Sequence, residues 1–279
     1  MTLGILAAIL GAAFLHAAWN AAIKVGTSRL GAMMLLSFGE VAIGLCVAAF
    51  FPLPAPDVWP WIAASSCAHF SYKFFLAKAY AHGDLSRVYP IARGAAPMIV
   101  ALVGGLFFLT DTLTPHEYIG IFILGLGILA MAQGIFIEGE NCKLIPFALG
   151  SALATASYTM IDGTGARVAG NAVMYIAWVF VVEGTLFIIA MLLVRGPSLI
   201  PRGRREWGAG VFAAAASYGA YAISVWAMTK APIAVVAALR ETSILFAVLI
   251  GWAVFGESLS RGKMVAAVII VAGVIVTRV

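Results

Sequence analysis

Residues 171–194 read NAVMYIAWVFVVEGTLFIIAMLLV, an apolar run that carries a single charged side chain, Glu183. A helix that crosses the hydrocarbon core of a bilayer needs about 20 predominantly apolar residues. This run has the length and the composition that such a helix requires. The segment therefore predicts a membrane-spanning helix, with one acid near its centre that needs a partner.

The composition of the whole chain agrees with this segment. Of 279 residues, 63% are hydrophobic and 10% are charged, whereas soluble domains are about 45–50% apolar and about 25% charged. So few charges could not cover so much apolar surface in water. The net charge of +5 is spread over the ends of apolar runs, which excludes a basic stripe for nucleic acid. We expect a multi-pass protein of the bacterial cytoplasmic membrane, with a lipid bilayer and no nucleic acid as partner.

Ten apolar runs have about the length of a spanning helix. They cover residues 3–24, 30–51, 60–81, 86–109, 116–137, 144–166, 171–194, 207–229, 231–256 and 262–278. The longest polar interruption between them is the segment 195–206. The predicted fold class is an all-α polytopic membrane protein with ten transmembrane helices.

The second half of the chain echoes the first at an offset of about 142–147 residues, and an odd number of helices per half requires the halves to be inverted in the membrane. Charged side chains at corresponding positions are the strongest part of this internal repeat. The matched positions are Glu40 and Glu183, Arg93 and Arg240, and Ser71-Tyr72 and Ser217-Tyr218. We therefore predict two inverted five-helix repeats, residues 1–141 and residues 142–279.

Seven ionisable side chains fall inside the predicted spans, where each costs at least about 2.5–3.5 kcal/mol. They are Glu40, Lys73, Arg93, Asp162, Glu183, Arg240 and Glu241. This cost requires them to face the bundle interior, and intramembrane charges usually mark a functional site. A structural alternative is that Glu40 and Glu183 pair with Arg93 and Arg240 and only fix the helix packing.

Arg240 and Glu241 are neighbours in the sequence. On a continuous helix they would point about 100° apart. We therefore expect that they do not aim at one point, and that one of them pairs with a neighbouring helix.

Helical spacing predicts which polar side chains share a face, because residues three and four apart are neighbours on a helix. The shared faces are His16, Trp19 and Asn20; His69, Tyr72 and Lys73; Tyr89 and Arg93; Tyr158 and Asp162; and Tyr218 and Tyr221. With Glu40, Glu183 and Arg240 they form the predicted substrate-binding set. On most of these helices an aromatic group lies one turn from an ionisable or amide group, which suits a small solute with both charge and apolar surface.

The balance of acids and bases in the core predicts a zwitterionic or amino-acid-like substrate, which needs one contact of each sign. Arg93 or Lys73 would hold the anionic end, and Glu40 or Asp162 would meet the cationic end or a coupling proton. The sequence has no phosphate-binding loop of the form GxxxxGK(S/T), and its cysteines and histidines lack metal-ligand spacing. We therefore expect no cofactor and no metal, and transport driven by a gradient or by exchange.

Three alternatives stay open at this point. A multidrug cation/proton antiporter would rely on the acids and aromatic groups. An intramembrane lipid-modifying enzyme would use His16, His69 and Asp162. A receptor or assembly subunit is the third, although duplication favours a transporter because it is a natural route to alternating access.

Three short motifs resemble the drug/metabolite transporter superfamily, specifically its EamA-type ten-helix branch. They are His16-Ala-Ala-Trp-Asn20 with Lys24, the stretch 79–97, and Phe255-Gly-Glu-Ser-Leu-Ser260. The last resembles the family's recurrent Gly-Glu-x-Leu-(Ser/Thr) turn, which the first half carries in altered form as Asp111-Thr-Leu-Thr114.

This resemblance covers essentially the whole chain. It implies a non-enzymatic exporter or exchanger of a small molecule, monomeric or homodimeric, with cytoplasmic termini. The positive-inside rule points the other way, since most Lys and Arg residues outside the helices lie on the side opposite the termini.

Overall fold

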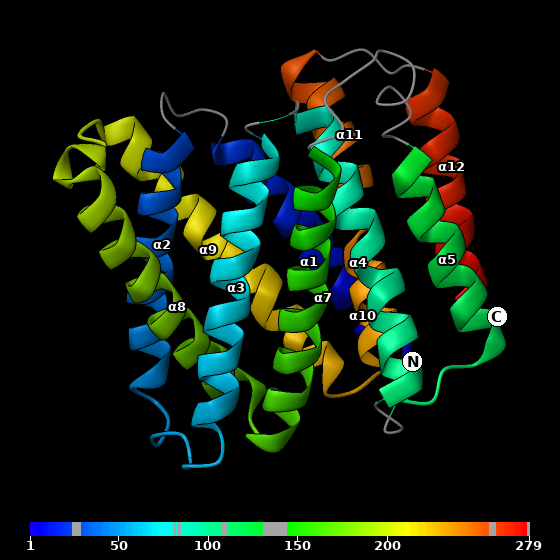
Figure 1. Ribbon diagram of the computed structural model, residues 1–279, viewed down its shortest axis with the longest axis horizontal. Coiled ribbons are helices and arrows are strands. Elements are labelled where there is room, and N and C mark those ends of the chain that lie inside the picture. Colours follow the sequence, from blue (N-terminus) through cyan, green and yellow to red (C-terminus); the bar gives the residue numbers. More distant parts are fainter. Residues whose placement is uncertain are drawn as a thin grey trace.

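The computed structural model describes residues 1–23, 29–80, 82, 85–107, 111–130, 144–256 and 261–277. Within these residues every regular element is a helix (Figure 1). The α-helices are α1 (Leu3–Ile23), α2 (Arg29–Ala48), α3 (Trp59–Tyr80), α4 (Leu85–Phe107), α5 (Pro115–Ala130), α7 (Leu144–Val168), α8 (Ala172–Arg195), α9 (Arg204–Met228), α10 (Ile233–Arg240), α11 (Ser243–Phe255) and α12 (Arg261–Val276). A short 3-10 helix, η1, covers Pro197–Leu199. The predicted boundary between the halves, at residues 141 and 142, lies outside the described residues.

Helix α8, which contains most of the run quoted first, shows how the local sequence sets its ends. Asn171 precedes the helix, and its side-chain oxygen accepts a hydrogen bond from the backbone N–H of Met174 at 3.0 Å, which caps the start. Gly196 ends it with φ at 77°, a conformation that favours glycine. Pro197 follows directly, and proline cannot continue a helix.

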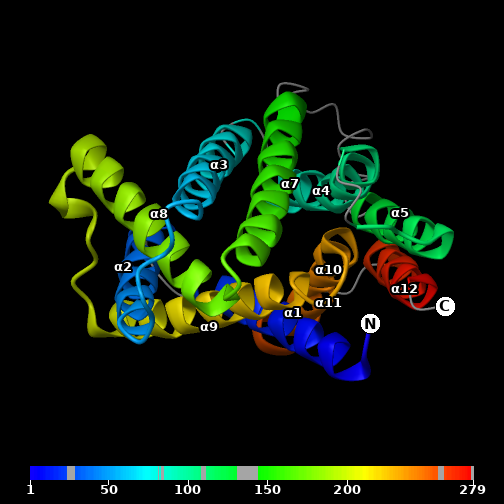
Figure 2. The ribbon, with the colours of Figure 1, turned by 90° about the horizontal axis from the view of Figure 1, so that it is seen from below.

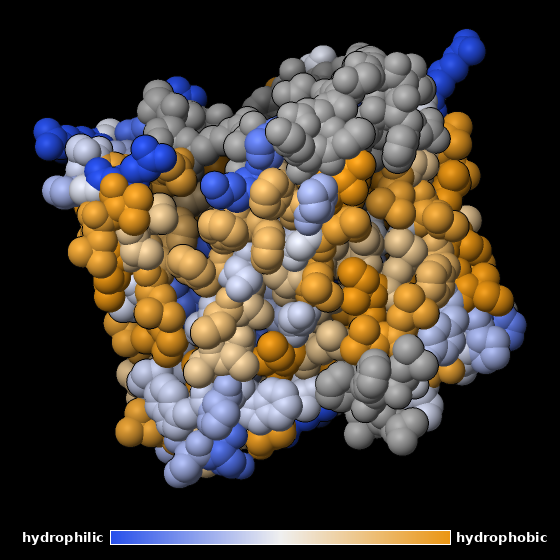
Figure 3. All heavy atoms as spheres, in the orientation of Figure 1, coloured by the Kyte–Doolittle hydropathy of each residue, from blue (hydrophilic) through white to orange (hydrophobic). Residues whose placement is uncertain are grey.

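Among the described residues, six helical segments are long and apolar enough to cross a membrane, judged by length and composition. They are Leu3–Ile23, Leu30–Ala48, Leu144–Val168, Ala172–Arg195, Arg204–Met228 and Ile233–Val254, and shorter apolar helices cover Ile91–Gly105 and Pro115–Ala130. Apolar side chains form a broad belt on the outside, with strongly hydrophilic ones mostly toward its two ends (Figure 3). Leu193 and Val268 are 81% and 69% exposed, which a lipid solvent tolerates. The chain is therefore an all-helical, multi-pass membrane protein.

The closest helix pairs join the first half of the chain to the second. Helix α3 packs on α7, α1 on α9, α2 on α8 and α5 on α12. Figure 2 shows the α2–α8 pair at one side of the molecule and the α5–α12 pair at the other, with α3, α7, α1 and α9 between them. Side chains from both halves therefore meet along the centre of the bundle.

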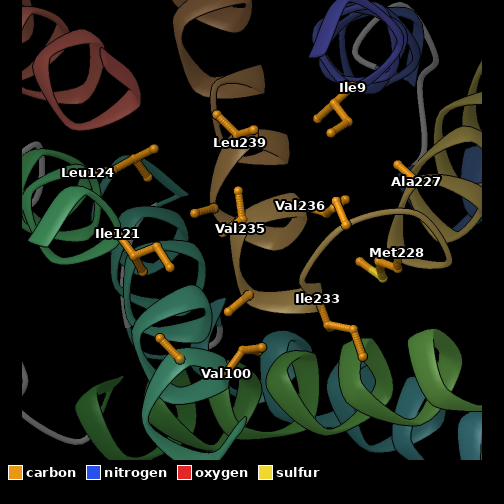
Figure 4. Close-up of a cluster of buried hydrophobic side chains, with 14 of the residues drawn as sticks. Ile9, Val100, Ile121, Leu124, Ala227, Met228, Ile233, Val235, Val236 and Leu239 are labelled. Carbon is orange, nitrogen blue, oxygen red and sulfur yellow. The ribbon is translucent and has the colours of Figure 1, made fainter. Parts of the chain in front are cut away.

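One expected helix differs from the prediction. The run 231–256 forms two helices, α10 and α11, because the chain makes a turn at Glu241 and Thr242. Helix α10 is buried along its whole length. Figure 4 shows Val235, Val236 and Leu239 of α10 pointing among apolar side chains of neighbouring helices, which fixes α10 inside the bundle.

A polar junction ties α10 to other elements at the end of the molecule where α9 turns into α10. The carboxylate of Asp111 accepts a hydrogen bond from the backbone N–H of Ile233 at 3.1 Å and lies 3.0 Å from Nη2 of Arg167. Arg167, at the end of α7, also donates to the carbonyl oxygens of Met228 and Ala231. This junction links α7, the α9–α10 turn and the segment before α5.

Candidate substrate-binding site

The acidic centre of the site is Asp162 on α7, whose side chain is completely buried. Tyr175 donates a hydrogen bond to its Oδ1 at 3.0 Å, and Tyr221 donates one to its Oδ2. Nε2 of His69 lies 3.3 Å from Oδ2. Among the described residues, no Lys or Arg lies within 4 Å of this carboxylate. Asp162 is therefore held by neutral hydroxyls and an imidazole, with no fixed cation beside it.

Aromatic rings surround this carboxylate. The ring of His69 stacks on Tyr158 with centroids 4.0 Å apart and an angle of 14° between the planes. Tyr72 meets the edge of Tyr158 at 5.9 Å, and Phe180 meets the edge of Tyr221 at 5.8 Å. We call Asp162 and these rings the acidic cluster. It includes His69, Tyr72, Tyr158, Tyr175, Phe180 and Tyr221.

Tyr218 lies beside the acidic cluster, one turn from Tyr221 on α9. Its ring stacks on Phe180 with centroids 5.0 Å apart. Its hydroxyl is buried and, in the part of the chain that the structure describes, has no hydrogen-bond partner. Because buried polar groups are normally hydrogen-bonded, this hydroxyl is a candidate contact for a polar ligand atom.

A second group of side chains, the basic cluster, forms at the turn between α10 and α11. Nε of Arg93 on α4 donates to Oε2 of Glu241 at 2.7 Å. Nη2 of Arg240 lies 3.8 Å from Oε1 of the same carboxylate and 3.5 Å from Oγ1 of Thr159 on α7. Arg240 and Glu241 thus do approach one point, unlike the expectation, over a long contact of 3.8 Å. Glu241 pairs with Arg93 of a neighbouring helix, as expected for one of the two.

Tyr221 joins the two clusters. Its hydroxyl donates to Asp162, and its ring centroid lies 5.8 Å from Cζ of Arg240. A carboxylate without a Lys or Arg partner among the described residues and a pair of guanidinium groups around one carboxylate therefore both lie close to the same side chain. The site is therefore dipolar: an acidic group, Asp162, and a basic group, Arg240, both lie near Tyr221.

A further charged pair in the core contains Lys73 on α3, one turn from His69. Its Nζ donates to Glu183 on α8 and lies 4.2 Å from the ring centroid of Phe187. The structural alternative for Glu183 named Arg240 or Arg93 as its partner, and the structure pairs Glu183 with Lys73 instead. Lys73 and Arg93, the two expected anion contacts, are thus both already bound to carboxylates.

Glu40 on α2 has a different environment. Its Oε1 accepts a hydrogen bond from the Ser217 hydroxyl on α9 at 2.7 Å, and the side chain is 4% exposed. Lys73 and Glu183 lie within electrostatic reach, although among the described residues no cation is within 4 Å of it. Glu40 and Asp162 are thus the two core acids without a close cationic partner in this part of the chain.

On α1, the three predicted residues lie together. Nδ1 of His16 accepts a hydrogen bond from Trp19 Nε1 at 3.2 Å, and the two rings meet edge to face. Asn20 donates to the backbone carbonyl of His16 at 2.8 Å. His16 lies within electrostatic reach of Arg93 and Arg240, beside the basic cluster. The side chain of Tyr89 lies outside the described part of the structure.

Comparison with known proteins relates part of this chain to a known family. The model of the EamA-like transporter family matches residues 143–279. The chain therefore contains, over these residues, a segment of the EamA-like transporter family. It is therefore a membrane transporter, as the sequence motifs indicated. The EamA match covers α7 to α12, which carry Asp162, Tyr221 and Arg240.

A solved crystal structure, described only as that of a protein, is similar over nearly the whole chain. It aligns with a TM-score of 0.78 and 18% sequence identity, and the alignment covers 98% of this chain and 97% of that chain. At this identity the likeness shows the fold alone. No curated protein matches the sequence.

Sequence reasoning did not include Tyr175, Ser217, Thr159 or Glu241 in the predicted site of this EamA protein. Tyr175 lies near the start of α8, where no periodic signal relates it to Asp162. Ser217 was used only as a repeat position. Glu241 was recognised as an intramembrane acid, which is the signal that could have placed it in the site.

The two clusters offer contacts that can bind a ligand. Among the described residues, no group of three or more His, Cys, Asp or Glu side chains is placed to hold a metal ion. What the two clusters offer is a carboxylate lined by aromatic rings and a basic group one tyrosine away.

Proposed function

We propose that this EamA protein is a secondary transporter, an exporter or exchanger, of a small zwitterionic or amino-acid-like metabolite. The observation that carries the proposal is the dipolar arrangement around Tyr221. Asp162 offers a negative charge without a Lys or Arg partner among the described residues, and Arg93 and Arg240 share the carboxylate of Glu241. A zwitterion complements both sides at once.

The acidic cluster is the proposed place for the cationic end. An ammonium group is attracted to a carboxylate and to the faces of aromatic rings. Tyr158, Tyr72 and Tyr221 lie around the carboxylate of Asp162. The unpartnered hydroxyl of Tyr218 supports the same position, since it supplies an additional donor or acceptor for a polar ligand.

Alternating access by ten helices in two inverted repeats is the proposed mechanism, across the bacterial cytoplasmic membrane. The helix pairs support it. If α1, α2, α3 and α5 correspond to α7, α8, α9 and α12, then the α3–α7 pair corresponds to the α1–α9 pair. The α2–α8 and α5–α12 pairs then correspond to themselves. Counting α10 and α11 as one broken span gives ten spans among the described residues, and broken helices at the substrate site are common in transporters.

A multidrug-type cation/proton antiporter is the second candidate. The aromatic wall around Asp162 favours it, because hydrophobic cations bind to aromatic faces. The two candidates differ at the basic cluster. A zwitterion would contact it through its anionic end, whereas a cationic drug would avoid it.

Thermal stabilisation of the purified protein tests both candidates. Amino acids, amines, organic acids, nucleotide sugars and hydrophobic cations would be compared at two pH values, since a ligand raises apparent stability with the logarithm of its concentration over Kd. Stabilisation by a narrow set of zwitterions would support the first candidate. Stabilisation by hydrophobic cations alone would replace it with the second, and stabilisation by none of the panel would contradict both substrate classes.

Asp162→Asn is expected to weaken binding of an amine-bearing ligand by at least about tenfold, because hydrogen bonds to charged groups contribute about 1.5–3 kcal/mol. Asparagine keeps the size of the side chain. The Kd is measured from ligand-dependent stabilisation of the purified protein. Asp57→Asn, in the exposed loop between α2 and α3, is the matched control and is expected to bind as the wild type does. Equal Kd values for both variants would remove Asp162 from the site.

Protons are the proposed coupling ion, and Glu40 is the proposed group that takes one up. Glu40→Gln fixes the side chain in a form that resembles the protonated acid, so it is expected to keep its fold and lose the pH dependence of transport. Uptake of the stabilising ligand into proteoliposomes, measured over a range of external pH, checks this. Glu206→Gln at the start of α9 serves as control. Unchanged proton coupling in Glu40→Gln would contradict the assignment.

A further inference from the structure

Arg240 is a buried cation with weak contacts. It is 4% exposed, and a guanidinium carries five N–H donors. Its Nη2 lies 3.5 Å from Thr159 Oγ1 and 3.8 Å from Glu241 Oε1. Within the described residues, its Nε has no hydrogen-bond partner. Because buried charges are normally paired and hydrogen-bonded, this guanidinium lacks contacts that a native protein usually supplies.

Other cations in the core have closer partners. Nε of Arg93 donates to Oε2 of Glu241 at 2.7 Å, so the carboxylate of Glu241 is directed more to Arg93 than to Arg240. Lys73 donates directly to Glu183. The weak contacts of Arg240 are therefore not a general property of buried cations in this bundle.

The Arg240 nitrogens that lack close contacts, Nε and Nη2, also have a geometry that suits a carboxylate. Nε and Nη2 donate from the same edge of the planar guanidinium, and that edge matches the two oxygens of a carboxylate. Nε is unpartnered among the described residues, and Nη2 makes only the two long contacts. The guanidinium lies 5.8 Å from the ring of Tyr221, whose hydroxyl reaches the acidic cluster.

We propose that Arg240 is the anion-binding residue of the transport site and that the group it binds is a carboxylate of the substrate. The carboxylate accepts from Nε and Nη2, and the ammonium of the same molecule lies toward Asp162, which the hydroxyl of Tyr221 contacts. This assignment rests on the proposed transport function and narrows it. It gives the anionic end to Arg240, since Lys73 and Arg93 already bind acids of the protein.

The test uses the purified full-length protein and two measurements. In the first, sodium acetate replaces sodium chloride at constant ionic strength, and the change in apparent melting temperature reports binding of a lone carboxylate. In the second, the Kd of each α-amino acid is compared with that of its amide, which lacks the negative charge. Both are made for the wild type, Arg240→Gln, Arg240→Lys and a control, Arg195→Gln, at the exposed end of α8.

We expect acetate to stabilise the wild type and Arg195→Gln, and not Arg240→Gln. The amino acid that binds best is expected to bind about ten- to hundredfold more tightly than its amide in the wild type. In Arg240→Gln this ratio falls to about one. Should Arg240→Gln fail to fold, Arg240→Lys decides the matter. Lysine keeps the charge and loses the two-point geometry, so the ratio falls by about fivefold or more, on the scale of one charge-assisted hydrogen bond.

Other results separate this inference from the proposed function. An acid-over-amide ratio that persists in Arg240→Gln overturns the assignment and leaves the zwitterion transporter standing. Equal binding of acids and amides, or binding of amines alone, overturns the carboxylate and favours the cation antiporter. Acetate stabilisation that Arg240→Gln abolishes, without binding of any amino acid, supports the anion site and contradicts the zwitterionic substrate. An acetate-insensitive wild type contradicts the anion site.

Discussion

Alanine at position 273 is expected to lower the free energy of unfolding by about 3 kcal/mol or more, at the upper end of what overpacking costs. A Cβ at Gly273 would lie 2.6 Å from the backbone nitrogen of Leu124, and 2.8 Å from Gly120 O and Leu124 Cα. These are backbone atoms of α5, so no rotamer change relieves the clash. Unfolding of the detergent-solubilised variant, followed by tryptophan fluorescence, measures the change.

Gly11→Ala is the matched control for this prediction. Gly11 lies inside α1, and a Cβ there meets no atom within 4 Å. Because alanine favours a helix over glycine by about 0.8–1 kcal/mol, this variant is expected to be as stable as the wild type or more stable. If Gly273→Ala were equally harmless, the close contact of α5 with α12 would not hold in the membrane-extracted protein. That contact joins the two halves at one side of the bundle (Figure 2).

Glu241→Ala is expected to cost about 3–5 kcal/mol of unfolding free energy, because removing one member of a buried ion pair leaves its partners uncompensated. Glu241 is 1% exposed, and its loss leaves Arg93 and Arg240, which are 3% and 4% exposed, without this carboxylate. Thermal or denaturant unfolding of the purified variant gives the value. Asp57→Ala, which removes an exposed acid, is expected to change stability by less than about 0.5 kcal/mol.

A second variant separates charge from packing in this result. Glu241→Gln keeps the volume of the side chain and can still accept a hydrogen bond from Arg93, so it is expected to lose less stability than Glu241→Ala. Equal stability of Glu241→Ala and Asp57→Ala would mean that the two arginines do not depend on this acid.

Helix positions were largely predictable from sequence. The expected spans 3–24, 144–166 and 171–194 correspond closely to α1, α7 and α8. The reason is physical: a segment that crosses a bilayer needs a minimum apolar length, and every polar interruption marks an end. The break at Glu241 and Thr242 was not predicted. It lies in the polar stretch Arg240-Glu241-Thr242-Ser243, which is short, contains no proline or glycine, and falls inside the single expected span 231–256.

The candidate site was predictable as a set of residues more than as a set of contacts. His69, Asp162, Tyr158 and Tyr221 meet in the acidic cluster, and Arg93 and Arg240 meet in the basic one. Tyr175 entered only with the structure, since its hydrogen bond to Asp162 depends on how α8 crosses α7.

The sequence by itself determined that this protein lies in a membrane and that its charged side chains face the inside of the helix bundle. Both follow from the cost of exposing charge to lipid, which depends on composition along each run. The tertiary structure alone decided which acid meets which base. Lys73 and Glu183 are 110 residues apart, and Arg93 and Glu241 are 148 apart. An ion pair needs its atoms within 4 Å, and only the packing of distant helices brings them that close.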